Sequence, residues 1–309
     1  DLLSFLLCRI EDIIASCAAY LRLGHCPVLN RLLNKPDDWA IMEWWLAVLL
    51  GILQGVTEWL PISSSGHLAI FQFYFNEEPP ILFDIILHLG SLCVIFYVMR
   101  EEIREVFLIL PNILDYKNYP NLKGYERMLM MVIVASVPTA IIGFTFDSTI
   151  IGDFYSEMHL VGGCLIFTGI LVWISKDYDG QKQIDDFPFS NALVIGFFQG
   201  LAILPGISRS GSTIAISKIL GMNPVKAARL SFLLFIPAIM GATLLKIGEI
   251  DETVEEVGLL ALSLGFLSSV FTSYFAVSAL LELIKQQKFH YFTPYCIILG
   301  LFLIYSSLF

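Results

Sequence analysis

Glu58 stands in a long apolar stretch, where an ionisable side chain is uncommon and most often functional. Gln54 precedes it by four residues, so on a helix both side chains lie on one face. We expect the two side chains to point at a common site. A structural alternative is that Glu58 only pairs with Arg209 or caps a helix.

Two loops rich in serine and glycine carry the next signal. Residues 60–67 read Leu-Pro-Ile-Ser-Ser-Ser-Gly-His, and residues 204–213 read Leu-Pro-Gly-Ile-Ser-Arg-Ser-Gly-Ser-Thr. Each loop leads into a helix, whose first N–H groups and positive dipole end favour a phosphate. Arg209 adds a planar, charged fork that can bind phosphate oxygens in pairs. The residues expected to bind a phosphate-bearing substrate are Gln54, Ser63, Ser65, Gly66, Ser208, Ser210, Gly211 and Thr213.

The two loops differ where catalysis would need them to differ. Ile203 and Arg209 of the second loop region take the places of Glu58 and Ser64 in the first. Ser64 is a candidate nucleophile, and His67 is a candidate general base or acid. Glu58 would hold a divalent cation on the phosphates or orient His67, and Arg209 would stabilise charge on a transferring phosphoryl group. The alternative is that both loops are turn and packing devices, as many Ser/Gly loops are.

His88 is a weaker candidate. Asp84 lies four residues before it on the same helical face, inside an apolar run. The two side chains could line the cavity as a pair, or His88 could make an interhelical hydrogen bond.

The composition identifies the elements that must position these residues. The 309 residues are 57% apolar and 15% charged, with a formal net charge of -10, and the mean hydropathy is +0.76. An ordinary soluble domain has about 25% charged residues. These values exclude a soluble enzyme, a disordered chain and a nucleic-acid binder, which would also need a basic face. The sequence therefore predicts an all-α polytopic membrane protein.

Six apolar stretches are long enough to cross a bilayer, which takes about 20 residues. They are residues 81–99, 127–146, 157–175, 229–247, 257–284 and 291–308. Residues 43–75 and 190–221 are also apolar, but a Pro/Ser/Gly loop breaks each of them. Irregular backbone at membrane depth must be buried in protein or line a wet cavity. We therefore expect two re-entrant helix–loop–helix hairpins in addition to the six transmembrane helices.

The two hairpins are copies of each other. A shift of 145 residues superimposes seven positions, which in the first copy are Gly51, Gln54, Gly55, Ile62, Ser63, Ser65 and Gly66. One hairpin and three spans form each copy, so the first repeat covers about residues 42–175 and the second about 190–309. Because three is odd, the second copy is upside down, which predicts an inverted repeat in one membrane domain, residues 42–309.

Lysine and arginine are distributed unevenly between the two sets of loops. Eleven lie in the loops near residues 100–127, 176–189, 222–229 and 285–290, and only Lys246 lies at the edge of the loops near 147–156 and 248–256. By the positive-inside rule the basic loops are cytoplasmic. The sequence thus predicts a plasma-membrane protein whose first hairpin opens outward, whose second opens inward, and whose C-terminus lies outside. Residues 1–41 are an N-terminal extension of uncertain origin, to which we assign no function.

The two loop regions resemble a known family. Residues 51–67 resemble the (E/Q)xxxE and P-x-S-S-[ST]-G-H region of undecaprenyl-pyrophosphate phosphatases of the bacitracin-resistance type, with Gln54 at the variable acidic position. Residues 205–213 are similar to the second signature of that family, P-G-x-S-R-S-x-x-T. With the order of the spans, the resemblance covers about residues 42–309.

The resemblance implies a membrane phosphatase that hydrolyses a polyprenyl diphosphate at the outer face and depends on Mg²⁺ or Ca²⁺. Such an enzyme recycles the lipid carrier for cell-envelope glycan synthesis and confers bacitracin resistance. The resemblance also implies that Glu58 and Gln54 bind the metal or handle protons, that Ser64 and His67 form the catalytic pair, and that Arg209 grips the phosphates. The expected partners are the lipid and the bilayer, with a homodimer possible. The competing interpretation is an inverted-repeat transporter or flippase for a phosphate-bearing substrate.

Overall fold

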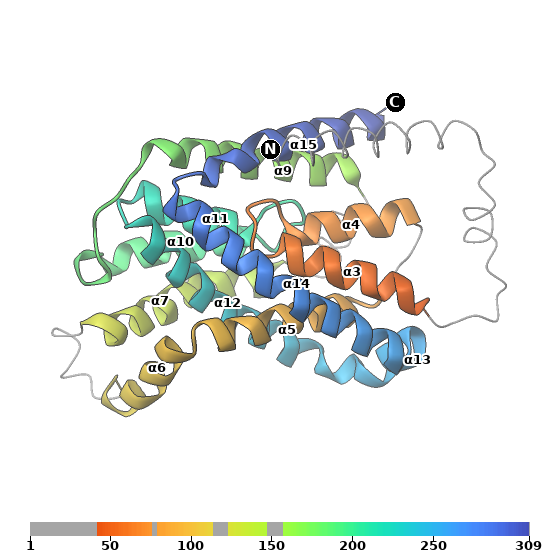
Figure 1. Ribbon diagram of the computed structural model, residues 1–309, viewed down its shortest axis with the longest axis horizontal. Helices are drawn as coiled ribbons and strands as arrows, with labels where there is room; N and C mark the ends of the chain where they lie inside the picture. Colours follow the sequence, from red (N-terminus) through yellow and green to blue (C-terminus); the bar gives the residue numbers. More distant parts are fainter. Residues whose placement is uncertain (1–41, 76–78, 114–122, 147–156, 309) are drawn as a thin grey trace. The chain divides into compact units, whose positions relative to one another are not determined.

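The computed structural model describes residues 42–75, 79–113, 123–146 and 157–308 (Figure 1). Apart from one isolated bridge between Lys182 and Met222, the secondary structure in these ranges is helical. The α-helices are α3 Trp44–Thr57, α4 Ser64–Phe75, α5 Ile81–Val98, α6 Arg100–Ile113, α7 Gly124–Thr145, α9 Met158–Ile174, α10 Phe189–Leu201, α11 Arg209–Ile219, α12 Pro224–Lys246, α13 Ile250–Val257, α14 Leu259–Lys285 and α15 Thr293–Leu308. The predicted extension, residues 1–41, lies outside the described residues.

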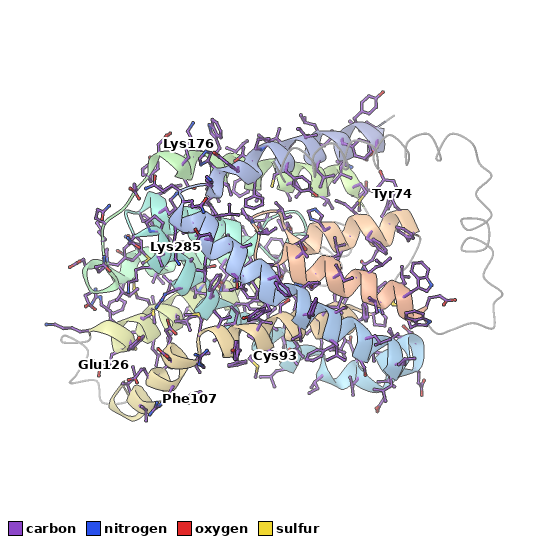
Figure 2. All side chains as sticks on the ribbon, in the orientation of Figure 1. Tyr74, Cys93, Phe107, Glu126, Lys176 and Lys285 are labelled. Atoms are coloured by element: carbon purple, nitrogen blue, oxygen red, sulfur yellow. The ribbon has the colours of Figure 1, made fainter. Side chains whose placement is uncertain are left out.

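Six helical segments are long and apolar enough to cross a membrane. They are Ile81–Val98, Gly124–Thr145, Met158–Asp177, Pro224–Val257, Leu259–Lys285 and Phe289–Leu308. Large apolar side chains project from their outer faces, such as Phe144, which is 74% exposed, and Leu244, which is 69% exposed. Figure 2 shows Phe107 of α6 projecting from the ribbon in the same way. A surface this apolar suits lipid rather than water, and the prediction of an all-α multi-pass membrane protein with six spans is confirmed.

The two broken apolar stretches form pairs of short helices. Helices α3 and α4 have 14 and 12 residues, which at 1.5 Å per residue gives about 21 and 18 Å. A hydrocarbon core is about 30 Å thick, so neither helix could cross it alone. Pro61 and the left-handed Ser63, with φ 66°, interrupt the first pair, and Gly206, with φ 99°, interrupts the second pair, α10 and α11. The predicted helix–loop–helix elements are therefore present.

Two helix contacts involve glycines that match in the sequence repeat. Helix α3 packs on α14, and α10, which corresponds to α3 in the sequence, packs on α7. Gly51 and Gly196, which are equivalent in the repeat, lie at these contacts. A Cβ on Gly51 would collide with the carbonyl of Gly265, and one on Gly196 would collide with the carbonyl of Ala135. The repeated glycines thus let each broken helix approach its neighbouring span closely.

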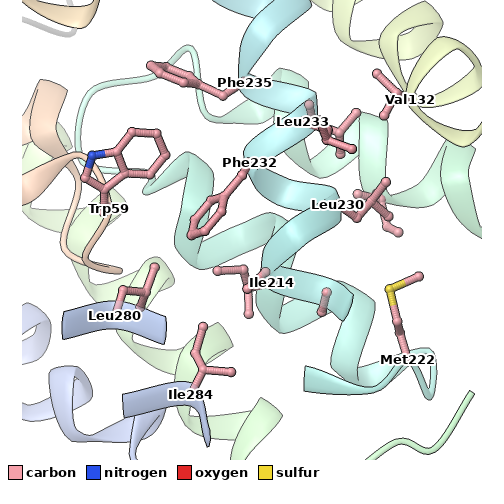
Figure 3. Close-up of a cluster of buried hydrophobic side chains, with 14 of the residues drawn as sticks. Trp59, Val132, Ile214, Met222, Leu230, Phe232, Leu233, Phe235, Leu280 and Ile284 are labelled. Atoms are coloured by element: carbon pink, nitrogen blue, oxygen red, sulfur yellow. The ribbon is translucent and has the colours of Figure 1, made fainter. Parts of the chain in front are cut away.

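Trp59 anchors the first loop in the protein core. Its buried indole makes edge-to-face contacts with Phe232 and Phe235 of α12, at 5.2 Å between ring centroids in both cases. Figure 3 shows this cluster continuing through Leu280 and Ile284 of α14. Aromatic contacts of this geometry add to the burial energy. The core therefore fixes the residue that directly follows Glu58.

Candidate active site

The two Ser/Gly loops contact each other. The backbone N–H of Gly206 donates to Oγ of Ser63 at 3.1 Å, and Oγ of Ser210 donates to the carbonyl of Leu60 at 3.4 Å. A Cβ on Gly66 would lie only 3.0 Å from Cα of Gly206, so the backbones meet where a side chain would not fit. One site is therefore assembled from two segments that are more than 140 residues apart in the chain.

The carboxylate of Glu58 lies at the centre of this site. Its Oε1 accepts a hydrogen bond from Nη2 of Arg209 at 2.6 Å. Its Oε2 accepts one from Oγ of Ser64 at 2.6 Å and one from Nε2 of Gln54 at 2.9 Å. The Glu58 side chain is 4% exposed. A buried carboxylate needs this kind of compensation, because an unpaired buried charge is strongly destabilising.

The guanidinium of Arg209 is held on several sides. Nη1 donates to the carbonyl of Ser231 on α12 at 3.0 Å, while Nη2 binds Glu58. The Cζ atom lies 4.2 Å from the ring centroid of Phe235 and 5.6 Å from that of Trp59. These contacts fix the plane of the fork, and they use two of the five N–H donors of an arginine. The geometry suits a cation that stays in place while an anion approaches.

His67 turns its ring toward Ser63 and Tyr295. Nδ1 lies 2.7 Å from the carbonyl oxygen of Ser63, and Nε2 lies 2.6 Å from the hydroxyl of Tyr295 on α15. The sequence predicts Ser64 and His67 as a pair, but the hydroxyl of Ser64 donates to Glu58 instead. The structure therefore brings His67 to the site without a hydrogen bond between these two residues.

His88 reaches the site from α5. Its Nε2 lies 3.3 Å from Oε2 of Glu58, and its Nδ1 donates to the carbonyl of Asp84 at 2.7 Å. The carboxylate of Asp84 instead accepts from Nε2 of Gln72, at 3.1 Å to each oxygen. Of the two interpretations left open by the sequence, the structure favours an interhelical contact, and the residue contacted is Glu58.

Several hydroxyl groups of the two loops form hydrogen bonds that stabilise the loops and the helices that follow them. Oγ of Ser63 accepts from the N–H of Gly66, and Oγ of Ser208 accepts from that of Gly211, so each serine caps the helix that follows. Thr213 shares a hydrogen bond of 2.6 Å with Ser231. These buried groups therefore stabilise the loops and the first turns of α4 and α11.

Comparison with known proteins places this architecture in a family. The sequence model for the bacitracin resistance protein BacA matches residues 47–302, which include both loops. The chain belongs to the BacA family. An undecaprenyl-diphosphatase of Alkaliphilus metalliredigens is 40% identical over 270 residues, covering 85% of this chain and 98% of the relative. The undecaprenyl-diphosphatase of Desulforapulum autotrophicum is 38% identical over 269 residues, with coverages of 84% and 97%. That of Methanobrevibacter smithii is 34% identical over 269 residues, with coverages of 85% and 97%.

A divalent cation would find few donors in this BacA-family chain. Within the described ranges, no group of three or more His, Cys, Asp and Glu side chains could hold a metal ion. Oε1 of Gln54 is buried without a hydrogen-bond partner in the described part of the chain, beside the Glu58 carboxylate. Mg²⁺ is often bound by one or two carboxylates together with substrate phosphates. A cation that arrives with a diphosphate would need only a few protein oxygens, and Glu58 and Gln54 are the residues that could supply them.

Sequence reasoning missed Tyr295 and Ser231, and it did not connect His88 with Glu58. Tyr295 is one of many aromatic residues near the ends of spans, and Ser231 lies within an apolar helix. Only the packing of α15, α12 and α5 around the loops brings these residues to the site. The place of His88 inside an apolar run did single it out, but nothing in the sequence identified Glu58 as its partner.

Proposed function

We propose that this chain hydrolyses undecaprenyl diphosphate, or a similar polyprenyl diphosphate, to the lipid monophosphate and inorganic phosphate. The shared name of its BacA-family relatives supports this reaction. The reaction would recycle the lipid carrier for cell-envelope glycan synthesis and would confer resistance to bacitracin.

The observation that carries the proposal is that the carboxylate of Glu58 binds two groups at once. One carboxylate oxygen accepts the hydroxyl hydrogen of Ser64, and the other binds Arg209. The Glu58 carboxylate can accept the proton of the Ser64 hydroxyl when its oxygen attacks. A serine nucleophile needs a base in this position. A transporter for a phosphate-bearing substrate would need the cation but not this arrangement, so the geometry favours hydrolysis.

In the proposed reaction, Oγ of Ser64 attacks the terminal phosphorus while its proton passes to Oε2 of Glu58. The bond from that phosphorus to the bridging oxygen breaks, and the lipid monophosphate leaves with the bridging oxygen. Water then attacks the phosphoserine, phosphate departs and Oγ regains a proton. Arg209 stabilises the phosphoryl oxygens in both steps, and His67 is a second group that can handle a proton. A water molecule that attacks the substrate directly is the alternative to Ser64.

A divalent cation, when bound, would neutralise charge on the diphosphate. The oxygens of Glu58 and Gln54 would hold it on the protein side. Gln54 and Glu58 lie one helical turn apart, which keeps both oxygens on the same face of the end of α3.

We propose the following arrangement in the plasma membrane. The pairs α3–α4 and α10–α11 are re-entrant hairpins, the two repeats within residues 42–309 are inverted, and the site opens to the outside, as does the C-terminus. The short helices, the loop-to-loop contact and the charge distribution of the loops support this arrangement.

Phosphate release from undecaprenyl diphosphate by the detergent-purified protein tests the function. We expect release with Mg²⁺ or Ca²⁺, loss of release after EDTA, and a fall of at least about 100-fold in Arg209→Ala, because the main phosphate-stabilising cation is gone. Arg229→Ala is the matched control, since Arg229 also binds a carboxylate, Glu102, but its side chain is 46% exposed and lies outside the site.

Ser64→Ala separates the two nucleophiles, with Ser278→Ala as the control for loss of an exposed hydroxyl on α14. Loss of turnover in Ser64→Ala supports attack by serine, whereas substantial residual turnover supports attack by water. Absence of release from folded wild-type protein with either metal would overturn the proposed function.

A further inference from the structure

Tyr295 contacts His67 across a long separation in the chain. Its hydroxyl lies 2.6 Å from Nε2 of His67, which is 228 residues away. The two rings are nearly parallel, with an interplanar angle of 7° and 5.7 Å between centroids. The short hydrogen bond between these two nearly parallel rings holds the imidazole in one plane.

The other ring nitrogen determines which way the hydrogen bond runs. Nδ1 of His67 lies 2.7 Å from the carbonyl oxygen of Ser63, and a carbonyl can only accept. Nδ1 therefore carries the hydrogen. In a neutral imidazole Nε2 then has a lone pair, so the hydroxyl of Tyr295 is the donor.

The local backbone supports the same assignment. Ser63 has φ 66°, a left-handed conformation that is uncommon for a residue other than glycine. This residue caps α4 through its Oγ and presents its carbonyl to His67. Its counterpart in the second repeat, Ser208, has an ordinary φ of -72°. The strained conformation thus occurs in the copy that carries the histidine, as expected where the backbone positions a reactive group.

We propose that Tyr295 is a positioning residue for His67. Its hydroxyl donates to Nε2, while Ser63 accepts from Nδ1, so that the only basic nitrogen of the imidazole is held in a fixed direction at the edge of the site. The tyrosine is 45% exposed and the histidine 8% exposed, so Tyr295 is the more accessible member of the pair. This inference rests on the proposed phosphatase function and on His67 as a proton-handling group.

Tyr295→Phe tests the hydroxyl alone, since the aromatic ring itself is kept. We expect kcat for undecaprenyl diphosphate to fall about tenfold, which is the effect of losing one hydrogen bond, with KM nearly unchanged. Tyr74→Phe is the matched control, because Tyr74 also joins α4 to α15, through a 3.4 Å contact with Ser306 on an exposed face. A Tyr295→Phe variant with wild-type kcat would overturn the proposal and leave the phosphatase function standing.

A double variant separates positioning from general support of the fold. If Tyr295 acts through His67, adding Tyr295→Phe to His67→Gln should lower kcat no further. A further tenfold loss on that background would overturn the proposal. If the wild-type protein releases no phosphate at all, the proposed function itself has failed.

Nitrogen-15 spectra of histidine-labelled protein give a readout that does not depend on activity. His67 is assigned by its absence in His67→Gln. At alkaline pH we expect the tautomer with hydrogen on Nδ1, and a shift of the Nε2 resonance in Tyr295→Phe but not in Tyr74→Phe. A wild-type tautomer with hydrogen on Nε2, or an Nε2 resonance that Tyr295→Phe leaves in place, would overturn the proposal.

Discussion

Oε1 of Glu58 and Nη2 of Arg209 lie 2.6 Å apart although 151 residues separate them in the chain. Their side chains are 4% and 13% exposed, so this ion pair is buried. It joins the end of α3 to the start of α11. The pair is therefore both the electrostatic centre of the site and a link between the two halves of the protein.

Removing one charge of this pair should destabilise the protein. We expect Glu58→Gln to lower the free energy of unfolding by about 3 kcal/mol, because Arg209 is left buried without its anion. The double variant Glu58→Gln, Arg209→Met should recover part of that loss, and we expect neither variant to release phosphate. Unfolding in a mild detergent, followed by circular dichroism, measures the difference.

The pair of Arg229 and Glu102 provides the control, because the arginine side chain is 46% exposed. Glu102→Gln should cost less than about 1 kcal/mol. Equal losses for Glu58→Gln and Glu102→Gln would contradict the importance of the buried pair.

Gln54→Glu should change the dependence on the cation. The substitution replaces the Nε2 donor, 2.9 Å from Oε2 of Glu58, with a second carboxylate oxygen. Two adjacent carboxylates repel each other unless a cation binds between them. We expect activity to be retained with Mg²⁺ or Ca²⁺, half-maximal activity at a lower metal concentration, and a lower stability in EDTA. The rate of phosphate release, measured over a range of metal concentrations, tests this prediction. If the metal concentration for half-maximal activity is the same in wild type and variant, a cation does not bind at this position.

His88 should support the site through its contact with Glu58. His88→Gln can still offer an N–H to Oε2 of Glu58, whereas His88→Leu cannot. We therefore expect kcat/KM to fall about tenfold in His88→Leu, as for one lost hydrogen bond, and less in His88→Gln. Steady-state rates of phosphate release by the two variants test this expectation. A leucine variant as active as wild type would show that the 3.3 Å contact has no part in the reaction.

The proposed topology predicts which loops are exposed on each side of the membrane. In a cysteine-free variant, a cysteine at Lys182 should be protected from a membrane-impermeant maleimide in intact cells, and one at Glu252 should react. The reason is that basic loops stay inside while the acidic helix α13 follows a span outward. Permeabilised cells, in which both positions should react, serve as the control. The reverse labelling pattern would invert the assignment of the two faces.

The six spans and the two broken stretches could be predicted because length and apolar composition alone define them. Glu58, Ser64 and Arg209 could also be singled out, since charge and hydroxyl groups in an apolar setting demand an explanation. Their partners could not be predicted. The direction of the Ser64 hydroxyl, the contact of His88 with Glu58 and that of Tyr295 with His67 depend on how α5, α12 and α15 pack around the loops. No periodicity within one helix encodes those distances.

The division of residues between the repeats has an evolutionary consequence. The first copy holds the carboxylate of Glu58, and the second has Ile203 in its place but supplies Arg209. Duplicated segments are usually free to diverge because one can cover for the other. Here neither half contains a complete site. A harmful substitution in one half therefore cannot be compensated by the other half. The two loops must therefore be selected as a single unit, even though they carry similar sequences.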